Sequence, residues 1–328
     1  MMSRLRTYFL ALLAVSMLAI PTGAAATSMT AAVPAFCTGT GPILATDISA
    51  PVDLSTCPIQ GRQIVQSLGN GLTGAGVYVP PAGSEEGNAA LATTGGYELI
   101  VSNAAGFVTV QESASSGQAG ATVTTNTDPA CSQSAFNYEP DKWTATDKWF
   151  YNKSTASRAG LTVSATTSDI RAANTNMTTG VNDCGFTGQP AAFGAFQGDT
   201  SLFANINSAG NCTSRFPDGQ STVSWGPFDS GLNFLAVTCF FGTGGTMEEG
   251  DIYFGSNVGM VDHLPSGCVS KSDLQSVATH EWGHVFGMAH ETSGNRETMY
   301  PVGGPCIAYQ RTLGLGDWQG MVNRYGLR

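Results

Sequence analysis

Basic residues are scarce in this sequence. Lysine and arginine together occur 14 times among 328 residues, against 24 aspartate and glutamate residues, which gives a formal net charge of -10. A surface with this charge repels phosphate groups. Nucleic acids and anionic membrane surfaces are therefore excluded as expected partners.

Long apolar runs are also lacking. The one marked run covers residues 8–20, which is short for a membrane span. It follows Arg4 and Arg6 and precedes the small residues Gly23–Ala26, an order typical of a secretory signal peptide. We therefore predict a signal peptide at residues 1–26 and a secreted, extracellular protein without a stable membrane anchor.

Histidine occurs only four times, and three of the four lie in one H-E-x-x-H-x-x-G-x-x-H segment. His280 and His284 are four residues apart, so on a helix both imidazoles face the same side and can reach one metal ion. Gly287 can adopt a positive φ, which would end the helix and bring His290 to the same ion. Three neutral nitrogens with an open fourth position are typical of a catalytic zinc site.

Glu281 follows the first histidine and is expected to face the open side of the zinc ion. A carboxylate there can take a proton from zinc-bound water and later deliver it to a leaving amine. A structural zinc site is the alternative, but such sites usually close the fourth position with cysteine or histidine, and the segment contains no further one. The residues therefore predict hydrolysis of an acyl bond, with Glu281 as general base.

A methionine, Met299, follows shortly after the third histidine and precedes Tyr-Pro. Alone it would be an ordinary core residue in a turn. After a complete zinc motif it resembles the Met-turn of metzincins, in which a methionine lies beneath the metal-binding histidines. Within the metzincins, the chain is most similar to the matrixins, the matrix-metalloprotease-like peptidases. The similar stretch runs from about Gly244 to Gly326 and includes Asp251–Phe254 and Asp317–Gly326.

The resemblance implies an α+β fold of the metzincin type, with a twisted mixed sheet, a zinc helix and a small C-terminal subdomain entered after Gly287. It also implies a monomeric zinc endopeptidase that binds an extended polypeptide along a sheet edge. Calcium is a second cofactor that the resemblance suggests. The acidic candidates for calcium ligands are Asp183, Asp199, Asp218, Glu248, Glu249 and Asp251.

The chain departs from the matrixin pattern at several positions. Only His263 lies outside the motif, so the second, structural zinc of matrix metalloproteases is not expected. Pro301 stands where astacins and serralysins have an additional tyrosine ligand. The specificity wall of matrixins often reads Pro-x-Tyr, whereas this chain has Pro301–Gly303, which leaves the side-chain preference open. The last helix begins with Gly316–Asp317 instead of paired acidic residues.

All eight cysteines follow the predicted signal peptide. An even number in an exported chain predicts disulfide bonds, although the sequence alone does not select their pairing. Pairing between neighbours along the chain gives Cys37–Cys57, Cys131–Cys184, Cys212–Cys239 and Cys268–Cys306.

The composition divides the remaining chain into two parts. Residues 27–137 are rich in small residues and contain alternating runs at 97–101, 107–111 and 121–125, which predict strands. Residues 138–328 are expected to form the peptidase domain, with a first strand at 149–152 and helices near 169–173 and 317–326. Its zinc helix is predicted to begin in a capping box at Ser272 and to end at Gly287.

The role of residues 27–137 stays open between an inhibitory propeptide and a retained binding or adhesion module. The context of Cys131 poorly matches the zinc-blocking Pro-Arg-Cys-Gly segment of matrixin propeptides. Three cysteines precede Tyr138 and five follow it, so complete pairing needs a bridge across the boundary. A cut there would leave the parts joined, which favours a retained module. A catalytically silent zinc-binding adhesin and a secreted structural protein are the alternatives to an enzyme, and the presence of Glu281 favours the enzyme.

Overall fold

The computed structural model describes residues 33–69, 72–115 and 128–328. The predicted signal peptide and the strand predicted at residues 121–125 lie outside this part of the chain. From residue 34 onward, the described residues form one compact unit. None of the helices described in it combines the length and the apolar character that a membrane span needs.

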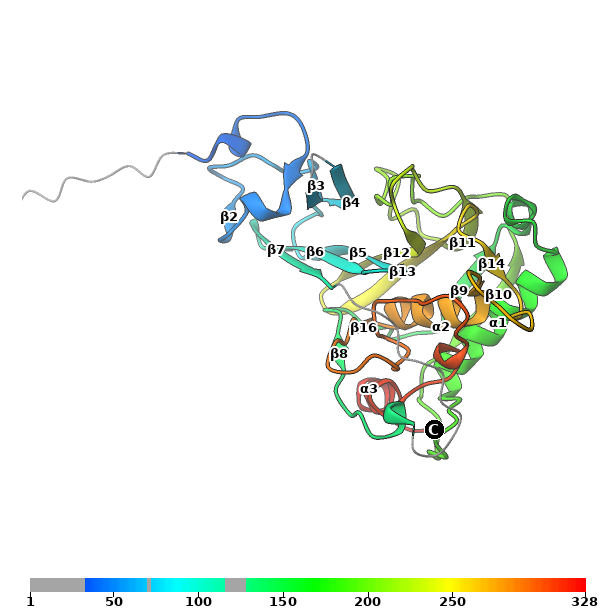
Figure 1. The fold of residues 1–328 in the computed structure, drawn as a ribbon. Helices are drawn as coiled ribbons and strands as arrows, with labels where there is room; N and C mark the ends of the chain where they lie inside the picture. The colour runs from blue at the N-terminus through cyan, green and yellow to red at the C-terminus, as the bar shows by residue number, and fades with distance from the viewer. Residues whose placement is uncertain (1–32, 70–71, 116–127) are drawn as a thin grey trace, which may run out of the picture. The chain divides into compact units, whose positions relative to one another are not determined.

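A nine-stranded mixed sheet runs through this unit in the order β10-β9-β11-β13-β12-β5-β6-β7-β2 (Figure 1). Neighbouring strands among β10, β9, β11 and β13 pair in parallel, and β12 is antiparallel to β13. The bounds of these five strands are β9 Asp147–Tyr151, β10 Gly194–Asp199, β11 Ser221–Gly226, β12 Phe234–Thr243 and β13 Thr246–Gly255. The strand predicted at 149–152 is therefore confirmed at residues 149–151, the end of β9.

The strands of the N-terminal part continue the same sheet. Strand β5 pairs antiparallel with β12 along almost its whole length, and β6 and β7 follow as a meander. Their bounds are β2 Val52–Asp53, β5 Ser84–Ala92, β6 Tyr97–Ala104 and β7 Phe107–Ala114. The strands predicted at 97–101 and 107–111 are confirmed. The pairing also means that β12 has no free edge beside β5.

Three α-helices accompany the sheet: α1 Val163–Thr179, α2 Leu274–Val285 and α3 Leu315–Tyr325 (Figure 1). Helices α1 and α2 share one apolar core with β9, β11 and β13, in which Trp149, Trp225 and Trp282 are fully buried. The predicted capping box at Ser272 is wrong, because the N-cap of α2 is Asp273. Its carboxylate accepts the Ser276 N–H at 2.9 Å and pairs with Arg311, while Ser272 belongs to a short strand.

A second apolar core lies on the other face of β12, β5 and β6. It includes Ile64 and Val77 of a small sheet together with Leu99 and Val237. That sheet has the order β1-β3-β4, with bounds β1 Ile43–Leu44, β3 Gln63–Gly69 and β4 Leu72–Tyr78. The two faces of the large sheet are thus covered differently, by the helices on one side and by this N-terminal sheet on the other.

The remaining elements are short. Two two-stranded pairs join β14 Met260–Val261 to β15 Ser272–Asp273 and β16 Met288–Ala289 to β8 Asn137–Tyr138. The 3-10 helices are η1 Ala35–Cys37, η2 Ala45–Asp47, η3 Pro129–Cys131, η4 Lys153–Ala159 and η5 Tyr309–Arg311.

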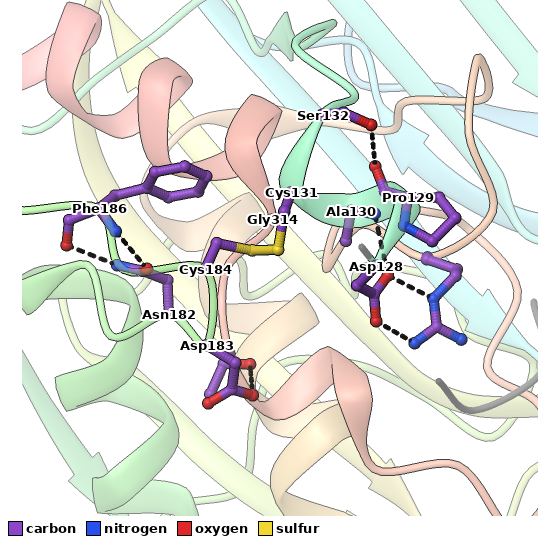
Figure 2. The surroundings of a disulfide bond; sticks show 12 residues. Asp128, Pro129, Ala130, Cys131, Ser132, Asn182, Asp183, Cys184, Phe186 and Gly314 are labelled. Atoms are coloured by element: carbon purple, nitrogen blue, oxygen red, sulfur yellow. Dashed lines mark hydrogen bonds and ion pairs between the residues drawn. A yellow bond between two sulfur atoms is a disulfide. The ribbon is translucent and has the colours of Figure 1, made fainter. Parts of the chain in front are cut away.

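All four expected disulfides are present. Figure 2 shows Cys131, at the end of η3, joined to Cys184. This bridge crosses the predicted boundary at Tyr138, whereas Cys37–Cys57 lies entirely within the N-terminal part. A cut between Cys131 and Tyr138 therefore leaves the two parts joined. A cut before Cys131 does not, which limits the inference drawn from counting cysteines.

Candidate metal centre

The three motif histidines converge on one point. Their Nε2 atoms lie 3.1 Å apart in each of the three pairs His280–His284, His280–His290 and His284–His290. Three nitrogens at about 2.0–2.1 Å from one tetrahedral zinc ion lie roughly 3.3 Å apart. The donor set therefore fits a single zinc ion, and these residues form a group that could hold a metal.

Local backbone geometry produces this convergence. His280 and His284 lie one turn apart on α2, and Gly287 just after the helix has φ 76°, as expected from the sequence. Its N–H donates to the His284 carbonyl at 2.8 Å, and the chain then turns into β16, which brings His290 to the helix. A side chain at Gly287 would also collide with the Asp141 carbonyl, because a Cβ would lie 2.4 Å from that oxygen.

All three imidazoles are held neutral. Burial lowers the pKa of His280 to about 4, and burial together with the neighbouring histidines lowers the pKa values of His284 and His290 well below the usual range. His280 Nδ1 lies 2.6 Å from the Thr298 carbonyl, so Nδ1 carries the proton and Nε2 keeps its lone pair for a metal. Neutral imidazole is the form that binds metal ions.

Two buried glutamates lie behind the histidines. Glu139 Oε1 is 3.3 Å from His284 Nδ1, and Glu98 Oε2 accepts the His290 N–H at 3.0 Å and lies 3.6 Å from His290 Nδ1. Burial, followed by the charge of Glu98, raises the pKa of Glu139 well above its usual range. Carboxylates in this position orient metal-binding histidines and increase their basicity. Glu98 comes from β6, in the N-terminal part of the chain.

Met299 packs against α2 at Gly283. It is almost fully buried, and a Cβ on Gly283 would lie only 2.1 Å from its sulfur atom. Asp317 of α3 fixes the turn, because its carboxylate accepts the N–H groups of Thr298 and Met299 at 2.7 and 3.1 Å. Since the Thr298 carbonyl accepts from His280, α3 indirectly orients the first histidine.

Glu281 lies between α2 and the sheet. The Thr238 hydroxyl of β12 donates to Glu281 Oε2 at 2.5 Å, and the Leu91 N–H of β5 donates to the same carboxylate. Burial raises the pKa of Glu281 to about 8, and these two donors partly oppose the shift. A cation at the triad would favour the ionised carboxylate, which is the form that accepts a proton.

The acidic residues considered for calcium do not form one site. Asp251 accepts the N–H groups of Asn205 and Thr222, both at 2.6 Å, and Glu249 accepts the N–H groups of Asp218 and Gly219. These carboxylates therefore hold a loop against β13. Within the described part of the chain, the one other acidic or histidine group with metal-like spacing is Glu98, Glu139 and His284, which shares a member with the triad.

Sequence reasoning missed four contributors: Glu98, Glu139, Thr238 and the backbone of Leu91. Glu98 carried a signal, because it is the one charged residue in the strand predicted at 97–101. The other three lie far along the chain from the motif and reach it only through the tertiary fold.

Comparison with known proteins agrees with this geometry. Residues 191–326 match the family model of the matrixins, a stretch that holds β11 to β13, α2, the Met-turn and α3. A comparison with curated proteins gave no match. Matrixins are metalloproteases, so the match supports a matrixin-like metalloprotease at residues 191–326, and the arrangement of the mixed sheet, α2 and the turn at Met299 is consistent with it.

Proposed function

We propose that this protein is a secreted, monomeric zinc endopeptidase that hydrolyses peptide bonds in extracellular proteins. One observation carries the proposal: three neutral imidazoles converge at 3.1 Å with the Glu281 carboxylate on the adjacent residue of the same helix. The matrixin match supports the same class of reaction.

Each group in the site has a role in this reaction. A zinc ion bound by the three histidines would polarise the scissile carbonyl and lower the pKa of a coordinated water to about 7. Glu281 accepts the proton of the attacking water and delivers it to the leaving amine. Glu139 and Glu98 hold His284 and His290 in position, and the Thr298 carbonyl fixes the tautomer of His280.

The substitution Glu281→Gln tests the mechanism. It removes the base and leaves the three nitrogens in place, so we expect one zinc per chain and a loss of hydrolysis of at least a hundredfold. Zinc content is measured by atomic emission and hydrolysis with casein or gelatin, with and without a chelator. Glu248→Gln, at an exposed position, is the matched control. Retained hydrolysis in Glu281→Gln would refute the role of the base.

A further inference from the structure

The catalytic groups of the proposed peptidase are enclosed in this structure. His280, Glu281 and His284 are fully buried, and His290 is 7% exposed. A peptidase of this kind must bring a polypeptide into contact with its base and its metal. Some element of the chain therefore occupies the space that a substrate needs.

The element that covers Glu281 is the end of β5. Strand β5 pairs antiparallel with β12 from Ser84 to Ala92, while its pairing with β6 stops at Ala90. Its last two residues, Leu91 and Ala92, thus leave β6 but stay on β12. The Leu91 N–H donates to Glu281, so this strand passes directly beside the base.

A second segment pairs with the other side of these two residues. Ala92 forms a parallel bridge with Val302, and the Gly303 N–H donates to the Ala92 carbonyl at 2.9 Å. The end of β5 therefore lies between the edge of β12 and residues 302–303, which follow the Met-turn. Main-chain hydrogen bonds on both sides hold it in an extended conformation.

The side chain of Leu91 is fully buried as well. It packs beside Leu235 on the helix-facing side of the sheet, and a Cβ on Gly303 would lie 2.7 Å from Leu235 and 3.0 Å from Leu91. Glu98 of β6 accepts the His290 N–H at 3.0 Å. Both Leu91 of β5, whose backbone N–H donates to Glu281, and Glu98 of β6 belong to the N-terminal part of the chain.

Peptides commonly bind proteins by adding a strand to a sheet edge. We propose that the end of β5 occupies the substrate cleft of this peptidase, so that the chain is autoinhibited and becomes active when residues up to 115 are separated from the rest. The inference rests on the proposed peptidase function. The proposed inhibition uses a strand and no cysteine, since all eight cysteines form disulfides with one another. It assigns the N-terminal part to inhibition, against the module that the cysteine count favoured.

The disulfides allow this separation. Residues up to 115 carry only Cys37–Cys57, and the next cysteine, Cys131, is joined to Cys184. A cut after Ser115 thus breaks the last covalent connection between β5 and the peptidase domain. Residues from Asp128 onward stay attached to that domain, because Asp128 pairs with Arg296 and Cys131 with Cys184 (Figure 2).

The experiment uses the full chain with the recognition sequence of a site-specific protease inserted after Ser115. Hydrolysis of a peptide library is compared before cutting and after cutting and gel filtration in mild urea. We expect at least a tenfold increase, together with faster hydrogen exchange of the β12 amides that face β5. Equal rates of hydrolysis in cut and uncut forms that both hydrolyse the library would overturn the proposal.

A second readout separates this inference from the proposed reaction. In the Glu281→Gln background, binding of a fluorescein-labelled casein peptide is measured by anisotropy for both forms. If neither form of the native sequence hydrolyses peptides, tight binding by the cut form alone supports the occupied cleft and refutes the peptidase. Equal binding by both forms, or binding by neither, overturns the occupied cleft.

Gly96→Val provides a test without cutting. A Cβ at Gly96 would lie 2.4 Å from the Pro301 carbonyl and 2.6 Å from the Ala90 carbonyl, so a larger side chain pushes the end of β5 out of its place. Gly41→Ala is the control, since nothing lies within 4 Å of a Cβ there. We expect Gly96→Val to raise hydrolysis by the uncut chain at least threefold. Unchanged or reduced hydrolysis in a variant that still melts cooperatively would contradict autoinhibition.

Discussion

Individual buried acidic residues position the candidate metal centre, and one of them makes the stability of the protein depend on pH. Glu139 and Glu98 are buried beside histidines, Asp317 accepts three backbone N–H groups, and Asp147, the first residue of β9, is fully buried. Glu139 and Glu98 contact two of the histidines that would bind zinc, and Asp317 holds the turn at Met299. Asp147 lowers the stability of the folded protein by an amount that depends on pH.

Replacing Glu139 should weaken zinc binding. Its carboxylate is the hydrogen-bond partner of His284 Nδ1, and loss of such a partner typically lowers metal affinity about 10- to 100-fold. We expect Glu139→Gln to show this decrease in a competition titration against a chromophoric chelator, with Glu248→Gln unchanged. Wild-type affinity in Glu139→Gln would show that the glutamate does not orient the ligand.

Replacing Asp147 should change how stability depends on pH. Burial raises the pKa of Asp147 from 3.8 to about 7. Between these values the folded protein holds a proton that the unfolded chain has lost, so the stability falls as the pH rises through this window. Asp147→Asn removes the effect, which is at most about 4 kcal/mol at about 1.4 kcal/mol per pKa unit.

Urea unfolding at pH 5 and pH 8 measures this prediction. The free energy of unfolding of Asp147→Asn should fall less between the two values than that of wild type, and Asp229→Asn, at an exposed position, should follow wild type. An equal decrease in the free energy of unfolding for Asp147→Asn and wild type would mean that Asp147 does not cause this pH dependence.

At the scale of elements, helix α2 and the turn at Met299 pack closely because Gly283 of α2 has no side chain. Gly283 lies between His280 and His284, and Met299 fills the space that its missing Cβ leaves. Alanine is normally about 1 kcal/mol more favourable than glycine inside a helix. Overpacking a close contact costs about 1–3 kcal/mol, so the contact should outweigh the propensity here.

Gly283→Ala should therefore destabilise the protein although it improves helix propensity. Thermal unfolding should show a lower midpoint for Gly283→Ala, whereas Gln275→Ala in the same helix should change it little. In a double-mutant cycle, Met299→Ala should cost less in the Gly283→Ala background than in wild type. Additive effects would show that the two residues do not compete for the same space.

The elements also show what the sequence could predict. The helix that holds His280 and His284 follows from a spacing of four residues, which acts within one segment. The four disulfides agree with pairing between neighbouring cysteines along the chain, although the sequence alone does not select that pairing. The N-cap of α2 was misplaced by one residue, since Arg311, distant in the sequence, holds Asp273. The pairing of β5 with β12 joins residues about 150 positions apart, and no local pattern specifies such a partner.

At the scale of the whole molecule, a bound zinc ion would stabilise the protein, because it binds the folded chain and not the unfolded chain. An ion present at about a thousand times its Kd contributes about 4 kcal/mol, which corresponds to roughly 10 °C in a domain of this size. A chelator should lower the melting temperature by this amount. His284→Ala should melt alike with and without chelator, while His263→Ala, whose side chain is 81% exposed, should keep the full difference. A chelator effect that persists in His284→Ala would indicate another metal site.

The covered edge of β12 has a consequence for solubility. Residues 234–241 carry no charged side chain, and the whole strand is buried up to its last residue. Once β5 leaves, this segment becomes an unprotected edge of the kind that pairs with other chains and aggregates. Separation of the N-terminal part would then start two competing processes, capture of a substrate strand and self-association, so the lifetime of the active form would depend on how much substrate surrounds it.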